Sequence, residues 1–153
     1  MEGEATPGIL SVTVVGVDLS RDTETIGNMS PYCTLTHKKK KLKTKVRSSA
    51  GKKAKFGDVF TFELEAPQEE IFVRVWDQDL MSSDAVGFVK VKVSSLMLND
   101  GITDDFTLYY ENNSAGTITL TSEWAPEGGS KFDQLKAEYD EQMVKLEEEL
   151  AAA

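Results

Sequence analysis

The chain has 153 residues, of which 40% are hydrophobic and 28% are charged, and this composition predicts one globular domain with a single core. Its formal net charge is −9, and its one cysteine, Cys33, excludes an intrachain disulfide framework. The acidic N-terminal residues 1–8 lack the profile of a signal peptide, and no apolar segment approaches the ~20 residues of a membrane-spanning helix. We therefore expect a cytoplasmic protein that is at most peripherally associated with membranes.

Short runs of β-branched and aromatic residues recur along the chain, with turn-forming residues between them. This pattern is typical of an all-β sandwich. Alternation of apolar and polar residues predicts that each strand buries one face against an opposing sheet, and no parallel βαβ crossover fits between the runs. The eight predicted strands span residues 9–17, 32–36, 42–46, 59–64, 71–76, 88–93, 106–110 and 117–124.

The chain changes character after residue 125. Residues 126–130 predict a glycine-containing linker, and residues 131–153 predict a C-terminal amphipathic α-helix. This helix would dock on its own domain or on a partner helix, or would form a coiled-coil dimer of about three heptads. Its apolar residues form one continuous stripe of Phe132, Leu135, Tyr139, Met143, Leu146 and Leu150.

The net charge conceals two regions of opposite sign. Residues 37–55 contain ten of the seventeen cations and no Asp or Glu, which gives this segment a formal charge of +10. The rest of the chain has seven cations and twenty-six carboxylates, a formal charge of −19. The basic segment and the acidic remainder therefore require separate explanations.

Two acidic clusters lie just beyond predicted strands. Asp22 and Glu24 belong to the first cluster, and Asp77, Asp79 and Asp84 belong to the second. Asp77 and Asp79 alternate and so should point in one direction, with Asp84 returning on the far side of the loop. Carboxylates held together repel unless a cation neutralises them, and calcium binds six to eight oxygens in flexible geometry. Spacing alone leaves two interpretations open, a metal site and solvated acidic loops.

Several short motifs, taken together, resemble the C2 domain family. The resemblance covers residues 7 to about 124, and none of the motifs is specific by itself. The motifs are GILSVTV at 8–14, GNMSPY at 27–32, KTK at 43–45, FGDVFTF at 56–62, VWDQD at 75–79 and DAVG at 84–87. The resemblance implies an eight-stranded antiparallel β-sandwich with calcium-binding loops at one end. Because a strand follows residue 116 and none precedes residue 9, it implies the type II topology, as in phospholipase C.

The resemblance also implies a set of metal ligands. The three third-loop aspartates of the family match Asp77, Asp79 and Asp84, although the stretch between the last two is one residue shorter than usual. An earlier first-loop aspartate is matched by Glu24, and a later one is replaced by Ser30. These matches imply at most one calcium ion of modest affinity, with Asp22 as a further candidate ligand. The alternative is a C2 sandwich that no longer binds calcium.

The basic segment predicts an anion-binding face. Alternation places Lys41, Lys43, Lys45 and Arg47 on one side of a strand. The family resemblance implies that this face binds phosphoinositide headgroups, as in protein kinase C-like C2 domains. The alternative is a solvated edge strand that lysines protect from aggregation. Two further lysines, Lys53 and Lys55, should extend the positive charge into the second loop.

Four apolar residues lie among polar ones at the predicted loop tips. They are Ile26 and Met29 in the first loop and Leu80 and Met81 in the third. Residues of this kind could insert shallowly into the interfacial region of a bilayer. Ordinary loop packing is the competing interpretation.

The favoured function is calcium-regulated binding to anionic phospholipid membranes, with phosphatidylserine or phosphoinositide as the ligand. The alternative is a calcium-independent protein interaction scaffold that uses the sandwich and the C-terminal helix. We expect no enzyme, because the one histidine, His37, lacks an apparent nucleophile partner and Cys33 should face the core. Nucleic-acid binding is not expected, because no aromatic platform accompanies the lysines.

Overall fold

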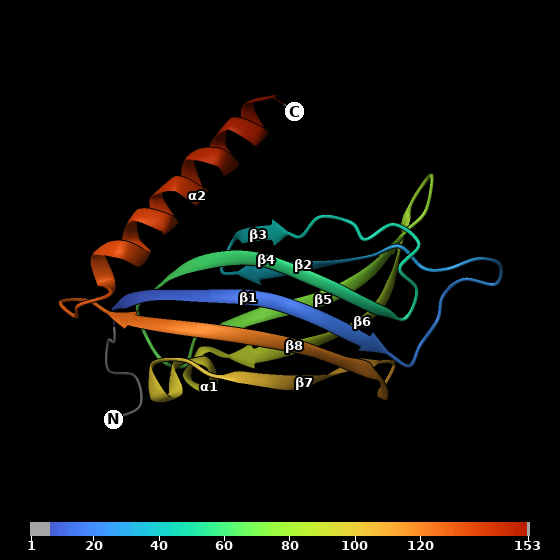
Figure 1. Ribbon diagram of the computed structural model, residues 1–153, viewed down its shortest axis with the longest axis horizontal. Coiled ribbons are helices and arrows are strands. Elements are labelled where there is room, and N and C mark those ends of the chain that lie inside the picture. The colour runs from blue at the N-terminus through green and yellow to red at the C-terminus, as the bar shows by residue number, and fades with distance from the viewer. Residues whose placement is uncertain (1–6, 153) are drawn as a thin grey trace.

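The computed structural model describes residues 7–152 and shows eight strands followed by a long C-terminal helix (Figure 1). The acidic N-terminal residues 1–6 and residue 153 lie outside the described residues. The strands are β1 (Gly8–Leu19), β2 (Pro31–His37), β3 (Lys40–Lys43), β4 (Lys53–Leu64), β5 (Glu70–Gln78), β6 (Ser83–Lys92), β7 (Thr103–Tyr110) and β8 (Asn113–Pro126). The helices are α1 (Val93–Met97), the 3-10 helix η1 (Leu98–Asp100) and α2 (Phe132–Ala152).

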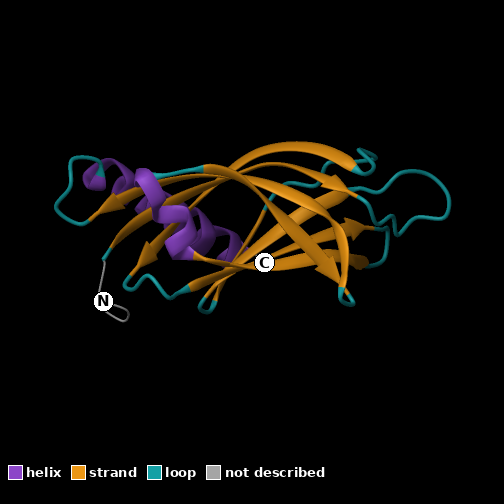
Figure 2. Ribbon diagram, turned by 90° about the horizontal axis from the view of Figure 1, so that it is seen from below, coloured by secondary structure: helices purple, strands orange, loops and turns teal. Residues whose placement is uncertain are grey.

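The strands form one antiparallel sheet that folds over on itself into a sandwich (Figures 1 and 2). Their order is β3-β2-β5-β6-β7-β8-β1-β4. β6 and β7 are paired only at Phe88 and Tyr109, and this narrow junction separates two four-stranded layers. β3 and β4 are the end strands, and the opening between them is called the seam below. The predicted eight-stranded all-β sandwich is confirmed.

The core lies between the two layers. Alternate residues of β1 and β5 enter it, and Leu10, Val12, Val73 and Val75 are fully buried. Cys33 is also fully buried, as predicted, and burial raises the pKa of its thiol. This apolar packing holds the ends of β1, β2, β5 and β6 in fixed positions, and the loops at those ends carry the acidic residues.

The strands differ in extent from the prediction, as β3 and β4 illustrate. β3 ends at Lys43, and the irregular residues after it are tied to both sides: the main-chain N–H of Thr44 donates to the carbonyl of Cys33 on β2, and that of Lys45 donates to Asp58 on β4. β4 begins at Lys53 and not at residue 59, because Lys53 and Lys55 already pair with β1. The extension was not predicted, because three of its six residues are charged and none is β-branched.

α2 packs against its own domain. Leu135 and Tyr139 are buried against Ile9 of β1 and Ala125 of β8, while Leu150 near the C-terminal end is 70% exposed. The first half of the predicted stripe is therefore occupied within the chain, which confirms docking on the same domain and leaves no continuous stripe for a coiled coil. Within residues 7–152, neither α-helix combines the length and the apolar character needed to cross a bilayer.

Candidate metal centre and basic face

Two loops at one end of the sandwich bring the predicted acidic residues together. Loop 1 joins β1 to β2 and contains Glu24, and loop 3 joins β5 to β6. Asp77 and Asp84 lie directly opposite one another on β5 and β6, and Asp79 follows β5 immediately. Alternation along the strand predicts that Asp77 and Asp79 point in one direction and that Asp84 faces them. The pairing of β5 with β6 agrees with this prediction.

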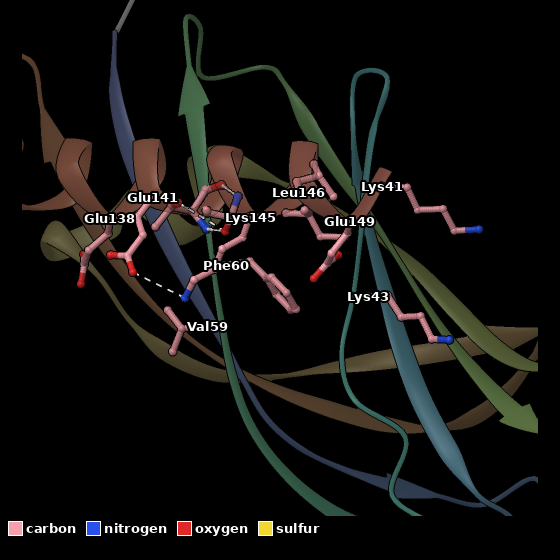
Figure 3. A pocket seen from close by; sticks show the side chains of 12 residues that line it. Lys41, Lys43, Val59, Phe60, Glu138, Glu141, Lys145, Leu146 and Glu149 are labelled. Atoms are coloured by element: carbon pink, nitrogen blue, oxygen red, sulfur yellow. Dashed lines mark hydrogen bonds and ion pairs between the residues drawn. The ribbon is translucent and has the colours of Figure 1, made fainter. Parts of the chain in front are cut away.

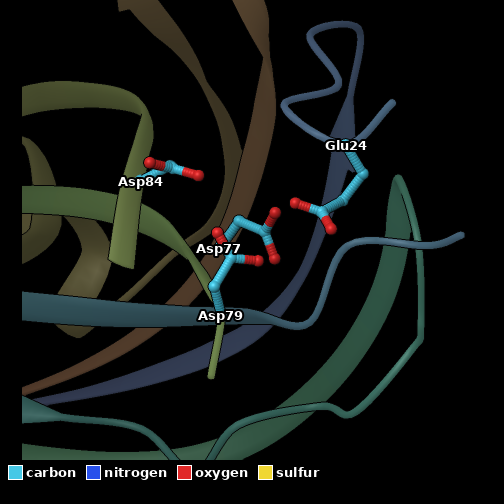
Figure 4. Close-up of side chains that lie close together, drawn as sticks. All are labelled: Glu24, Asp77, Asp79 and Asp84. Atoms are coloured by element: carbon cyan, nitrogen blue, oxygen red, sulfur yellow. The ribbon is translucent and has the colours of Figure 1, made fainter. Parts of the chain in front are cut away.

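The four carboxylates form one cluster. Glu24, Asp77, Asp79 and Asp84 each offer an oxygen, and these oxygens all lie within 4.8 Å of one another (Figure 4). Figure 4 shows Glu24 reaching from loop 1 toward the three aspartates. A donor set made only of carboxylate oxygens suits a hard divalent cation such as calcium. The residues present therefore fit a calcium ion that is completed by main-chain carbonyls or water.

Asp77 is the most buried member of the cluster. It is 1% exposed, and its two oxygens accept hydrogen bonds from the N–H of Ser30 and the hydroxyl of Thr23, each 2.8 Å long. The main-chain N–H of Gln78 donates to the carbonyl of Ser30 over 3.0 Å, which ties β5 to the end of loop 1. These contacts fix the carboxylate before any cation binds, which lowers the entropic cost of binding.

Ser30 serves the site through its main chain. Its hydroxyl accepts a 2.9 Å hydrogen bond from the N–H of Ser49, in the connection between β3 and β4. Because that oxygen is engaged with Ser49 and carries no charge, it is a poor substitute for an aspartate. This geometry supports the expectation of a single ion.

Hydrogen bonds between carboxyl groups of the cluster are the largest cause of two raised pKa values. A hydrogen bond with Asp77, followed by partial burial and by the charges of Asp77 and Asp79, raises the pKa of Glu24 to about 7. A hydrogen bond with Asp84, with burial and nearby negative charge, raises the pKa of Asp79. Without a cation, the cluster therefore retains protons that isolated carboxyl groups would release.

Asp22 is not part of the cluster. Its Oδ1 accepts a 2.9 Å hydrogen bond from the main-chain N–H of Glu24, and its side chain is exposed. The prediction that Asp22 is a ligand is therefore wrong for this geometry. Its short side chain instead forms a local turn that shapes the backbone at Glu24.

The loop tips divide into exposed and buried residues. Ile26, Leu80 and Met81 are almost fully exposed, at 89%, 103% and 95%. Met29 is fully buried in the main core, so the prediction that it inserts into a membrane is wrong. Its carbonyl accepts from the N–H of Gly51, and this contact holds the end of loop 1 against the adjoining connection.

Lysines and aromatic rings share one face of the β3-β2-β5-β6 layer. The ammonium of Lys43 lies 4.3 Å from the ring centre of Tyr32, and that of Lys41 lies 5.8 Å from the ring centre of Trp76. The two rings are stacked with their centres 6.3 Å apart. We call Lys41, Lys43, Tyr32 and Trp76 the basic face. Both lysines are exposed, and cation–π contacts hold them over the sheet.

Arg74 continues this face toward β6. Its guanidinium lies 5.2 Å from the ring centre of Trp76 and 5.0 Å from that of Phe72. Sequence analysis missed these aromatic and arginine residues, although their alternation at 72, 74 and 76 was visible. The missing information was the register that pairs Tyr32 with Trp76 on the neighbouring strand.

The other predicted lipid-binding cations lie elsewhere. Arg47 is half-buried and forms a 2.7 Å ion pair with Asp58, so its guanidinium is already engaged, and its part in lipid binding stays a prediction. Lys45 is exposed just beyond β3. Lys53 and Lys55 are also exposed, but they belong to β4 in the other layer and do not extend the second loop.

Comparisons with known proteins identify the class of domain. The family model described as the C2 domain matches residues 8–108. Since this match covers most of the chain and agrees with the observed sandwich, the chain belongs to the C2 domain family.

The curated relatives differ in how much of their length this chain covers. Synaptotagmin-4 of Arabidopsis thaliana is 26% identical over 121 residues, which make up 78% of this chain and 21% of the relative. The chain thus spans about a fifth of that protein's length. Elicitor-responsive protein 3 of Oryza sativa subsp. japonica is 24% identical over 122 residues, which make up 78% of this chain and 85% of the relative.

Solved structures support the same fold. A single C2 domain of plant Extended Synaptotagmin 1 has a TM-score of 0.71 at 16% identity, covering 79% of this chain and 96% of that one. The calcium-bound pair of C2 domains from Extended-Synaptotagmin 2 has a TM-score of 0.67 at 18% identity, covering 78% of this chain and 46% of that one. Family membership and the acidic cluster together support calcium and phospholipid binding as the general function.

Proposed function

We propose that this chain binds anionic phospholipid membranes peripherally and that one calcium ion of modest affinity regulates the binding. The observation that carries the proposal is the four-carboxylate cluster directly beside the exposed loop residues. Loop 3 connects Asp77 to Asp84 and has Leu80 and Met81 at its tip. An ion held by this cluster would lie close to any lipid that these loops contact.

Calcium would act by changing the charge of the end of the sandwich that carries loops 1 and 3. Four carboxylates repel anionic headgroups, and a divalent cation removes half of their formal charge. The ion also keeps coordination positions that phosphate oxygens of lipids can fill, because calcium takes six to eight ligands. Once repulsion is reduced, Ile26, Leu80 and Met81 can enter the interfacial region.

The basic face would supply the headgroup contacts. Each lysine close to an anionic surface contributes about 1 kcal/mol, and the contribution falls off within a Debye length. Lys41 and Lys43 lie over aromatic rings, which order their long side chains before a ligand arrives. A phosphoinositide suits this arrangement because its headgroup carries several phosphates. Lys45, which is exposed just beyond β3, would add to the attraction.

Vesicle sedimentation tests this function. The full chain is mixed with phosphatidylcholine vesicles, with vesicles that also contain phosphatidylserine, or with vesicles that contain phosphatidylinositol bisphosphate, in calcium or in a chelator. We expect pelleting with both anionic lipids in calcium and weaker pelleting in chelator. Lys41→Ala with Lys43→Ala should weaken phosphoinositide binding most, whereas Lys53→Ala with Lys55→Ala, at exposed positions of β4 in the other layer, serves as the charge-matched control. Absence of pelleting under every condition would contradict the proposal.

A further inference from the structure

α2 lies across the seam, where the sheet leaves its two end strands apart. Gln142 binds the main chain of Thr61 on β4 at two points, with its Oε1 accepting from N–H at 2.8 Å and its Nε2 donating to the carbonyl at 2.9 Å. These two bonds replace those that a neighbouring strand would make. α2 thus covers the edge of β4, and these two hydrogen bonds fix its position there.

The helix also reaches the basic segment. The ammonium of Lys40 on β3 donates to the hydroxyl of Tyr139 over 2.5 Å and lies 5.1 Å from the centre of its ring. One lysine of the basic run is therefore already bound by α2. The next two lysines, Lys41 and Lys43, border the same side of the seam as the second half of the helix.

A cleft of about 430 Å³ lies between α2 and the strands β3 and β4, beside the contact of Gln142 with Thr61. The charged side chains lining it are three cations and three carboxylates, namely Lys41, Lys43, Lys145, Glu138, Glu141 and Glu149. Glu141 pairs with Lys145 at 3.5 Å, which leaves Glu138 and Glu149 as the uncompensated acids of the cleft within residues 7–152. Figure 3 shows Glu149 on the part of α2 nearest to β3, with the ammonium groups of Lys41 and Lys43 pointing away from the helix.

The acidic residues therefore act on the lysines through space and without direct pairing. Residues 131–150 contain three cations and seven carboxylates, and the last turn of α2 has no basic residue. The C-terminal end of a helix also carries a partial negative charge from its aligned peptide dipoles. Glu149, near this end, lines the same cleft as Lys41 and Lys43.

We propose that the face of α2 that lines the cleft, with Glu138, Glu141 and Glu149, is a built-in competitor for anions at the basic face. Its carboxylates lower the positive potential at Lys41 and Lys43 and so weaken resting affinity for phosphoinositide membranes. The inference rests on the proposed function and specifies its regulation. A membrane with enough negative charge, or a basic partner that neutralises α2, would relieve the competition.

Two variants with equal changes in charge provide the test in the full-length chain. The inner variant carries Glu138→Gln, Glu141→Gln and Glu149→Gln, which neutralise the carboxylates of the cleft. The outer variant carries Asp133→Asn, Glu147→Gln and Glu148→Gln, which are exposed and do not line the cleft. Circular dichroism should show equal helix content in both variants and the wild type.

Affinity is measured by sedimentation with phosphatidylinositol bisphosphate vesicles in chelator, so that the calcium centre does not contribute. We expect the inner variant to bind about three- to tenfold more tightly than wild type and the outer variant less than about twofold more tightly. The difference should shrink at 0.5 M salt, where the Debye length falls to about 4 Å.

Two results would overturn the inference in distinguishable ways. If wild type pellets with anionic vesicles but both variants gain equally, or neither gains, only the inference fails. If neither wild type nor a variant pellets with any anionic vesicle, even in calcium, the proposed function fails as well.

Discussion

The hydroxyl of Thr23 donates a 2.8 Å hydrogen bond to Oδ2 of Asp77 and so joins loop 1 to β5. Asp77 is the most buried carboxylate of the cluster, and Thr23 supplies one of its two hydrogen bonds from loop 1. Removing a group that holds a metal ligand in place often lowers metal affinity 10- to 100-fold. Thr23 should therefore affect calcium binding although it need not touch the ion.

Thr23→Val tests this relationship, because valine keeps the shape of threonine and loses the donor. We expect calcium affinity to fall about 3- to 30-fold, with little change in the free energy of unfolding in chelator. Isothermal titration with calcium measures the effect. Thr25→Val, at an exposed position of the same loop, is the control and should bind calcium like wild type.

Ser30→Asp should strengthen calcium binding. The substitution places a carboxylate where the family has its later first-loop aspartate, and more ligand charge raises calcium affinity. We expect titration to detect either a second ion or a several-fold tighter first ion. Ser30→Asn, which matches the size of aspartate without its charge, should produce neither change. Equal behaviour of the two variants would show that this position lies outside coordinating distance.

Calcium binding should depend on pH through Glu24. Because its pKa is raised to about 7, calcium must displace a proton from the cluster near neutral pH, and affinity should rise between pH 6 and pH 8. Titration in two buffers of different ionisation enthalpy measures the protons released. Glu24→Gln should abolish most of the release, and an unchanged release would assign the proton elsewhere.

The raised pKa of Glu24 also affects the stability of the calcium-free protein. A pKa of about 7 in the folded state exceeds the ordinary value of 4.5, so the folded form binds more protons than the unfolded chain between these values. Stability in chelator should therefore decline as pH rises from about 4.5 to 7, and calcium should remove the decline. Urea denaturation at a series of pH values measures the effect, and a flat profile in chelator would contradict it.

Leu135→Ala should loosen α2 from the sandwich. Leu135 is 2% exposed and packs with Tyr139, Ile9 and Ala125, and comparable truncations destabilise proteins by about 2–5 kcal/mol. Urea denaturation measures the loss, and Val144→Ala, at a 54% exposed position, should change stability by less than about 0.5 kcal/mol. Equal effects of the two substitutions would contradict the observed docking of the helix.

The fold could be predicted because its determinants are local and repetitive. Apolar alternation on β4, β5 and β8 identified the buried faces, and the family motifs identified Glu24, Asp77, Asp79 and Asp84 as one group. The charged start of β4 and the ion pair of Arg47 with Asp58 depend on contacts between distant segments. No local pattern encodes such contacts.

The site residues likewise divide into those that a local pattern identifies and those that only the folded structure distinguishes. Met29 and Ile26 are both apolar residues of loop 1, yet one is buried and the other is 89% exposed. Sequence could not separate them, because the path of the loop decides which one faces the core. The stacking of Tyr32 on Trp76 depended on the pairing of β2 with β5, which became visible only in the structure.

The most direct test of the calcium centre is a calorimetric titration of the full chain with calcium. The account predicts one ion of modest affinity for wild type and a large loss for Asp77→Asn. Asp84→Asn, at an exposed position, should show the same loss without risk to the core. No binding heat at millimolar calcium in the wild type, or equal heats in all three proteins, would contradict the proposed centre.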